Sequence, residues 1–219
     1  MKATTSDLQG IAWELREKAL DMLYHAGSGH PGGSLSEAEI VSALYFSVLN
    51  VRPDDPLWDE RDRFVLSKGH GCPTVYAALA KRGFFPESQL ADLRQYGSIL
   101  PGHPDMNKTP GIDMSTGSLG QGFSAGVGMA LGLRHQQKNS YVYVLLGCGE
   151  LQEGQVWEAA MAAAHYRLDR LIAVVDYNRL QIDGKNDDVM ALEPLGEKWR
   201  AFGWHVQQVD GHDISALLD

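Results

Sequence analysis

The sequence predicts an α/β protein with a three-layer α/β/α arrangement, in which a mainly parallel sheet is the middle layer. Two apolar runs carry this prediction. Residues 141–146 (YVYVLL) and 171–175 (LIAVV) are short, rich in β-branched side chains and without polar alternation. Such runs are typical of strands that are buried on both faces of a parallel sheet. Residues 151–168 between them have helical spacing and several alanines. Together the three segments predict a strand–helix–strand crossover.

The other elements are expected in chain order on either side of this crossover. Ser6 and Gln9 have the spacing of a capping box, which predicts that a helix begins there and ends near residue 24. Ser34 and Glu37 predict a second cap after a glycine-rich loop. The further expectations are a helix to about residue 49, a strand over 63–66, helices ending near residues 81 and 96, an irregular segment over 97–119, helices over 120–137 and 193–202, and a strand over 204–209 (WHVQQV). An irregular segment of that length in a compact domain is usually functional.

Length, charge and cysteine content limit the classes to which this chain can belong. With 219 residues, 44% of them hydrophobic, the chain is long enough to bury the core of one domain. Its net charge of −9 argues against nucleic acids and anionic membranes as partners. The sequence has no apolar stretch of membrane-spanning length and no apolar signal segment near its start. Its two cysteines have neither metal-finger nor disulfide-scaffold spacing, so we expect a cytoplasmic enzyme.

The chain ends soon after the last predicted strand. Little more than a turn of helix follows Gly211-His212-Asp213, and the final strand expected of such a crossover unit is missing. We therefore expect residues 1–219 to form a single domain that lacks its last C-terminal elements, either because it is trimmed or because it is naturally minimal. The alternative is that Asp219 is a native terminus with a frayed tail.

Glycines and polar residues follow both central strands at one edge of the predicted sheet. Gly147-Cys148-Gly149-Glu150 ends the first apolar run, and Asp176-Tyr177-Asn178 ends the second. In open α/β sheets this edge binds phosphorylated ligands, helped by the amino end of the following helix. The glycines let backbone approach a phosphate, and Asn178 offers a hard oxygen to a divalent cation.

This pair of motifs resembles the thiamine diphosphate signature, which is Gly-Asp-Gly followed about thirty residues later by Asn. The surrounding sequence GCGELQEGQVWEAAM is similar to the transketolase family, including its split form with two genes for the two halves. The likeness runs from about residue 7 to the end of the chain. It implies a thiamine diphosphate cofactor and transfer of a two-carbon ketol unit from a ketose phosphate to an aldose phosphate. One residue departs from the family, because Cys148 stands where Asp is expected.

The resemblance also implies roles for residues in several loops. His30, His70 and His103 each lie in a Gly/Pro loop (SGHPGG, KGHGC and PGHPD) whose segments could converge at one sheet edge. His30 and His103 match family positions that contact sugar hydroxyls, and His70 matches one that reaches the cofactor diphosphate and the substrate. An isolated histidine is more often a surface or capping residue. The cofactor-binding residues implied by the family are His70, Gly117, Leu119, Gly147, Gly149, Glu150, Asn178 and Ile182.

The departure at Cys148 lies in the loop that the resemblance implies as the metal-binding loop. The ligands implied by the family are the side chains of Cys148 and Asn178, the carbonyl of Leu180 and two diphosphate oxygens, around Mg²⁺ or in its place Ca²⁺ or Mn²⁺. These ions prefer hard oxygen ligands, whereas cysteine offers a soft sulfur. Three outcomes stay open: weaker magnesium binding, preference for a softer ion, or loss of the cofactor.

The resemblance further implies a partner. Glu153 and Glu158 match carboxylates at the subunit interface of transketolases, although most such pairs form a solvated helix face. The carboxylate that activates the cofactor, and the arginines that grip the sugar phosphate, lie on a pyrimidine-binding domain that this chain lacks. We therefore expect a C-terminal, pyrimidine-binding partner subunit. The expected assembly is a heterotetramer, or a homodimer when the chain is purified alone.

Three other interpretations compete with this one. The alpha subunit of a 2-oxo acid dehydrogenase is a close rival, but its second motif usually has paired asparagines, whereas this chain has Asp176-Tyr177-Asn178. Deoxyxylulose-phosphate synthase shares the expected fold, but its single chain carries all domains. From a different class, the chain could be a non-catalytic scaffold subunit, an interpretation that Cys148 keeps open.

Overall fold

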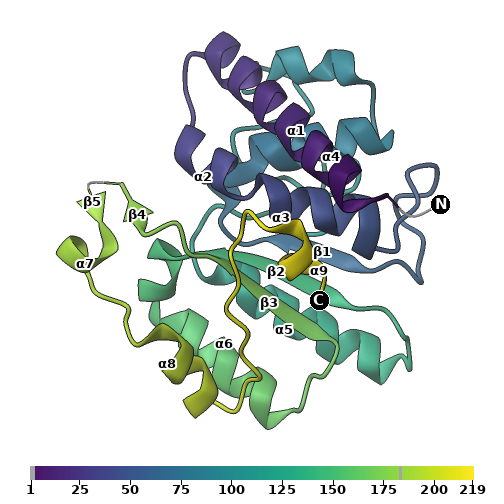
Figure 1. The fold of residues 1–219 in the computed structure, drawn as a ribbon. Coiled ribbons are helices and arrows are strands. Elements are labelled where there is room, and N and C mark those ends of the chain that lie inside the picture. The colour runs from purple at the N-terminus through teal and green to yellow at the C-terminus, as the bar shows by residue number, and fades with distance from the viewer. Residues whose placement is uncertain (1–2, 183) are drawn as a thin grey trace.

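The computed structural model describes residues 3–182 and 184–219. These residues form three layers, with a central sheet between two layers of helices (Figure 1). The strands β1 (Arg63–Leu66), β2 (Val142–Gly147) and β3 (Leu171–Asp176) are parallel and lie in the order β1-β2-β3. Val144 of β2 pairs in register with Val65 on one side and Ala173 on the other. The predicted α/β class with a parallel sheet is therefore confirmed.

Helices cover both faces of this sheet (Figure 1). The first face is covered by elements from the first half of the chain: α1 (Thr5–Ala26), α2 (Pro31–Ser36), α3 (Ala38–Ala43), the π-helical turn η1 (Leu44–Val48), η2 (Gly69–Gly71), α4 (Cys72–Arg82) and η3 (Glu87–Asp92). The second face is covered by α5 (Gln121–His135), η4 (Gly149–Gln152), α6 (Gly154–His165) and α8 (Leu195–Ala201). The small hairpin β4 (Leu180–Gln181) and β5 (Gly184–Lys185), with α7 (Asn186–Val189) and α9 (Ile214–Leu218), complete the structure. In the described ranges, no helix is long and apolar enough to cross a membrane.

Alternate strand side chains point into two separate cores. One core joins the sheet to α1, α3 and α4 through Phe64, Leu66, Tyr143 and Leu145. The other joins it to α5 and α6 through Val65, Val142, Val144 and Leu146. Because β2 lies between two strands and two helical layers, it is buried along its whole length, as predicted. The edge strand β3 is only partly buried, which corrects the expectation that both runs are fully buried.

Both predicted helix caps near the amino end are wrong. Thr4, not Ser6, is the N-cap of α1, and it exchanges hydrogen bonds with Asp7 in a capping box. Ser34 lies inside α2 rather than capping a helix, and its hydroxyl donates to the carbonyl of His30 at 2.9 Å. Glu37 joins α2 to α3, and its side chain makes no capping hydrogen bond within the described ranges. A position one or two residues away offers the same residue types, so local pattern alone could not choose between them.

The predicted strand over residues 204–209 is also wrong. No strand forms there, and in the described part of the chain these residues make no backbone ladder with β3. A strand requires a neighbour to pair with, which the amino-acid pattern cannot supply. The irregular segment 97–119 is confirmed, and the expected helix after Asp213 is α9, where the Asp213 carboxylate accepts from the backbone of Ser215 and Ala216.

Candidate functional site

The loops that follow all three strands meet at one edge of the sheet. This arrangement follows from the parallel order, because the carboxyl ends of β1, β2 and β3 lie side by side. The backbone N–H of Cys148, after β2, donates to the carbonyl of Asp176 at the end of β3, at 3.2 Å. The backbone N–H of Ser67, after β1, donates to Leu145 of β2 at 2.9 Å. The sheet thus places three separate loops within contact of one another.

The three predicted histidines converge at this edge. The ring of His30, which precedes α2, lies with its centroid 5.4 Å from that of His70 and 6.5 Å from that of His103. These residues come from the loop before α2, from η2 after β1, and from the irregular segment 97–119. The convergence that the sequence predicted is therefore confirmed, while the contacts of each histidine with ligand stay a prediction.

Glycines let these loops approach so closely. A Cβ on Gly33 would lie 2.8 Å from the His70 ring, and one on Gly69 would lie 2.9 Å from the backbone nitrogen of Gly117. Gly117 has a φ of 146°, and a Cβ there would lie 3.2 Å from the His103 ring. Any larger residue at these three positions would push the histidine loops apart.

Two of the histidines are held in their neutral form. Burial, and then the charges of Lys68, His30 and His103, lower the pKa of His70 to about 4. Burial, followed by Arg94 and His30, also lowers the pKa of His103 below its usual value. Near pH 7 both rings are therefore uncharged, so each has a lone pair that can accept a hydrogen bond from a hydroxyl.

Cys148, Asn178 and Leu180 come together at the same edge of the sheet. The Cys148 thiol is buried and donates to Oδ1 of Asn178 at 3.3 Å and to the carbonyl of Leu180 at 3.7 Å. The predicted ligand trio therefore converges, with two hard oxygens and one soft sulfur. The oxygens fit Mg²⁺, but the sulfur does not. Across the described residues, no three His, Cys, Asp or Glu side chains are grouped to hold a metal ion.

The side chain of Glu150 makes hydrogen bonds within the protein. The buried carboxylate accepts from the Ser67 hydroxyl at 2.5 Å and from the backbone N–H groups of Gly120 at 2.8 Å and Gly147 at 3.0 Å. Burial raises the pKa of Glu150 in spite of these hydrogen bonds. This side chain ties the loops after β1 and β2 to the start of α5. The predicted cofactor contact of Glu150 stays a prediction.

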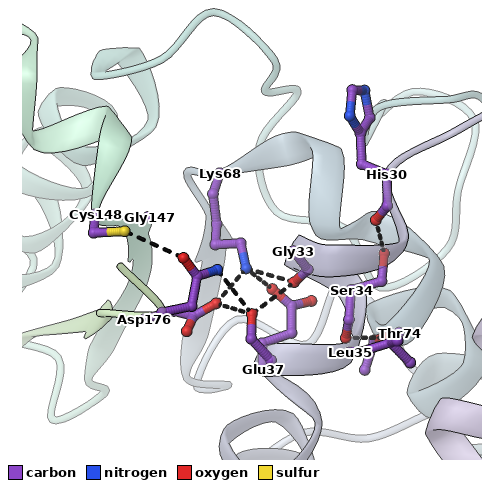
Figure 2. A network of polar contacts seen from close by, with 12 residues as sticks. His30, Gly33, Ser34, Leu35, Glu37, Lys68, Thr74, Gly147, Cys148 and Asp176 are labelled. Carbon is purple, nitrogen blue, oxygen red and sulfur yellow. Dashed lines mark hydrogen bonds and ion pairs between the residues drawn. The ribbon is translucent and has the colours of Figure 1, made fainter. Parts of the chain in front are cut away.

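A buried lysine links the loops after β1 and β3 to α2 (Figure 2). The side chain of Lys68 is 1% exposed, and its Nζ donates to the carbonyl of Gly33 at 2.6 Å and to Oδ2 of Asp176 at 2.7 Å. The same Oδ2 accepts from the hydroxyl of Ser36 at 2.5 Å. The Ser36 hydroxyl in turn accepts from the side-chain amide of Asn178 at 3.2 Å.

Lys68 also faces a second carboxyl group, that of Glu37. Oε2 of the fully buried Glu37 lies 2.8 Å from Nζ, and apart from Lys68 neither Glu37 oxygen has a hydrogen-bond partner in the part of the chain that the structure describes. Burial, only partly offset by Lys68, raises the pKa of Glu37 to about 8. Burial lowers the pKa of Lys68, but the two carboxyl groups outweigh it and the net pKa is raised. Near pH 7 Glu37 therefore keeps its proton beside the Lys68 ammonium group.

The remaining predicted residues lie at or near this edge. Ile182 is 98% exposed and Leu180 is 60% exposed, so neither anchors its loop by burial. An apolar side chain as exposed as that of Ile182 fits contact with an apolar ring of a ligand. Leu119 is partly buried and lies two residues before the start of α5. Glu153 and Glu158 are both exposed. Glu153 is the N-cap residue of α6, so it precedes the helix on which the sequence predicts it.

The sequence did not indicate the roles of Lys68, Asp176, Ser36 and Glu37. A signal was available for Lys68, because a lysine only two residues after a buried apolar strand is unusual. Asp176 gave a similar signal at the end of β3. Glu37 was predicted only as part of a helix cap, and no pattern indicated the contacts of Ser36 or Glu37, because their partners come from distant loops.

Comparison with known proteins agrees with this geometry. Residues 9–219 match the family model described as "Transketolase, thiamine diphosphate binding domain". The chain is 53% identical over 212 residues to a 6-deoxy-6-sulfo-D-fructose transketolase subunit (SqwG) of a Clostridium species, covering 97% of this chain and 77% of that protein. It is 42% identical over 218 residues to an apulose-4-phosphate transketolase subunit of Phocaeicola vulgatus, covering 100% of this chain and 76% of that protein.

Solved structures give the same result. Transketolase from Leishmania mexicana superposes with a TM-score of 0.93 at 35% identity, covering 100% of this chain and 34% of that one. The chain thus spans about a third of a single-chain transketolase and about three quarters of the subunit relatives. These matches favour transketolase over the alpha subunit of a 2-oxo acid dehydrogenase. The chain therefore belongs to the transketolase family, whose thiamine diphosphate-binding domain it carries.

Proposed function

We propose that this chain is the N-terminal, diphosphate-binding subunit of a split transketolase, which transfers a two-carbon ketol unit from a ketose to an aldose. The observation that carries the proposal is that His30, His70 and His103 converge, and that Cys148 meets Asn178, at the carboxyl edge of the sheet. The family match and the similarity to named transketolase subunits support it.

The chain's own residues would bind the cofactor and handle protons. Bound thiamine diphosphate supplies the carbanion chemistry that breaks the carbon–carbon bond next to the ketose carbonyl. The loops of Gly117 and Leu119, of Gly147 and Gly149, and of Asn178 would hold it, with Ile182 against its thiazolium ring. His70 and His103, being neutral, would accept and return hydroxyl protons of the sugar, and His30 would orient a second hydroxyl.

The donor set for the cation mixes hard and soft atoms. Asn178 Oδ1 and the Leu180 carbonyl would bind Mg²⁺ together with diphosphate oxygens, while the thiol of Cys148 replaces a carboxylate that would bring both charge and a hard oxygen. The proposal is therefore that magnesium binds more weakly than with Asp, and that Mn²⁺ tolerates the sulfur better.

The substrate class is proposed to be an anionic sugar. Arg94 and Lys108 line an open hollow next to His103, and neither side chain makes an ion pair among the described residues. Such cationic groups can attract a phosphate or sulfonate group of a sugar. The two subunit relatives are named for a sulfonated and a phosphorylated sugar, both of which are anionic.

A second subunit is proposed to complete the site. The pyrimidine-binding domain, with the activating carboxylate, would come from the C-terminal subunit, in a heterotetramer of two-fold symmetry. Glu153 and Glu158 would lie at the interface, and the chain alone would form a homodimer through the same face.

Calorimetric titration of thiamine diphosphate into the complex of both subunits tests the proposal. The titration is run with Mg²⁺, with Mn²⁺ and with EDTA. Saturable binding that EDTA abolishes supports a working cofactor site, and ketol transfer between sugar phosphates, followed by product analysis, then supports the activity. No binding with either ion, while a Cys148→Asp variant binds, would instead favour a non-catalytic scaffold subunit.

A further inference from the structure

A single hydrogen-bond relay runs from buried Lys68 to the amide of Asn178. Lys68 donates to Asp176 at 2.7 Å, Ser36 donates to the same oxygen of Asp176 at 2.5 Å, and the Asn178 amide nitrogen donates to Ser36 at 3.2 Å. Three separate segments supply these groups: the loop after β1, the end of α2 and the end of β3. Figure 2 shows Lys68 between Gly33, Glu37 and Asp176, with the thiol of Cys148 turned toward the same cluster.

The chemistry of the groups makes this relay directional. An ammonium group has only protons to give, so Oδ2 of Asp176 must accept from Lys68. A hydroxyl has one proton, and Ser36 uses it on the same carboxylate oxygen. Ser36 can then only accept from Asn178, which presents its NH₂ group to Ser36.

The contact with Ser36 also determines the direction in which the amide oxygen of Asn178 points. With its nitrogen toward Ser36, Asn178 turns Oδ1 to the loop of Cys148, where the oxygen accepts from the backbone N–H of Leu180 at 3.0 Å and from the Cys148 thiol at 3.3 Å. If the amide were reversed, a nitrogen would occupy the place of an oxygen ligand, and a cation could not bind it.

We propose that Ser36 is a positioning residue, which fixes the side-chain amide of Asn178 with its oxygen toward the cation. The inference rests on the proposed function, since that function makes Asn178 a ligand. Partners that orient a metal ligand commonly affect metal affinity by about 10–100-fold. The Ser36 hydroxyl bonds to Asp176 and Asn178, and therefore acts on the cation through Asn178.

The test uses Ser36→Ala, which removes the acceptor for the Asn178 NH₂ group. In NMR spectra of the chain, the side-chain amide signals of Asn178, assigned through Asn178→Asp, are expected to shift in Ser36→Ala. The matched control is Ser42→Ala, at a buried serine away from the site, whose hydroxyl donates to the backbone carbonyl of Leu8 at 2.7 Å. Unchanged Asn178 signals in Ser36→Ala would overturn the inference without any use of the cofactor. If Ser36→Ala fails to fold, Ser36→Cys, a poor acceptor of similar volume, takes its place.

A second readout connects orientation with binding. In the complex with the partner subunit, the Mg²⁺ concentration that half-saturates thiamine diphosphate binding is expected to rise about tenfold in Ser36→Ala. Ser36→Thr, which keeps the hydroxyl, should restore the wild-type value, and Ser42→Ala should not change it. Equal Mg²⁺ requirements in Ser36→Ala and wild type would overturn the inference. Failure of the wild-type complex to bind thiamine diphosphate with any cation would instead show that the proposed function has failed.

Discussion

Cys148 places a sulfur between two oxygens at the carboxyl end of β2. Its Sγ lies 3.3 Å from Asn178 Oδ1 and 3.7 Å from the Leu180 carbonyl, so the side chain points at both candidate oxygen ligands. A carboxylate at the same position would add a negative charge and a hard oxygen, both of which favour Mg²⁺. In the proposed cation site, the residue at position 148 would therefore govern how strongly the loop binds a hard cation.

Replacing Cys148 by Asp should strengthen magnesium-dependent binding of thiamine diphosphate. The Mg²⁺ concentration for half-saturation is expected to fall about tenfold, which corresponds to about 1.4 kcal/mol. Calorimetry on the two-subunit complex measures it. Cys148→Ser, which has nearly the same size and an uncharged oxygen, serves as the control and should lie between the two. Identical Mg²⁺ requirements for the Cys148→Asp variant and the wild type would show that the loop is not a cation site.

Glu37 should make stability fall as pH rises. Its folded pKa of about 8 is raised above the usual 4.5, so between these values the folded protein holds a proton that the unfolded chain has released. The stability contribution is complete below about pH 4.5 and is lost as the pH rises to 8. In urea unfolding between about pH 5 and pH 8.5, Glu37→Gln should lack this part of the decline. Glu158→Gln, on the solvent side of α6, is the control, and an equal pH dependence of Glu37→Gln and wild type would contradict the assignment.

At the scale of elements, close approach between helices, strands and loops depends on a few glycines. Gly126 of α5 faces β2, and a Cβ there would lie 2.6 Å from Cγ2 of Val144. Gly128, two residues along the same helix, has no described atom within 4 Å of its Cβ position. The two glycines share a helix but have opposite surroundings, so they form a matched pair.

Alanine at these two positions should have opposite effects on stability. Gly126→Ala is expected to lower the free energy of unfolding by about 1–3 kcal/mol, because α5 must move away from the sheet. Gly128→Ala is expected to raise it by about 0.5–1 kcal/mol, because alanine costs less backbone entropy in a helix. Urea unfolding of the two variants against wild type measures both. A loss of equal size in Gly128→Ala would show that the helix does not tolerate any side chain there.

At the scale of the whole molecule, the site is open on one side. Ile182 is 98% exposed, His103 lies beside an open hollow, and Glu153 faces solvent. In the described residues these groups have no covering element. A partner subunit that closes this side would exclude water from the histidines and complete the site.

The isolated chain should therefore be inactive in ketol transfer, and activity should appear only when the pyrimidine-domain partner is added. Enzyme assays with each of the two proteins by itself and with a mixture of both measure this. Light scattering of the same samples distinguishes a homodimer of the chain from a heterotetramer of the mixture. Ketol transfer by the chain alone would contradict the proposed division of the site between two subunits.

The amino-acid sequence by itself determined the α/β class, the three parallel strands and the edge at which the site lies. Strand periodicity and the crossover rule are local or depend only on chain order, so the runs ending at Gly147 and Asp176 could be interpreted without coordinates. The three histidines could be named because their Gly/Pro loops match the motifs of a known family, and the structure brings their rings together.

Only the tertiary structure decided which groups touch. It showed that residues 204–209 find no strand to pair with in the described ranges, that Thr4 rather than Ser6 caps α1, and that Glu150 binds the protein's own loops. It also showed the relay from Lys68 through Asp176 and Ser36 to Asn178. These residues lie up to 142 positions apart in the chain. A hydrogen bond forms only when the donor–acceptor distance is correct to within a few tenths of an ångström. A one-dimensional pattern specifies which elements form, but contacts between distant side chains exist only after those elements have packed together.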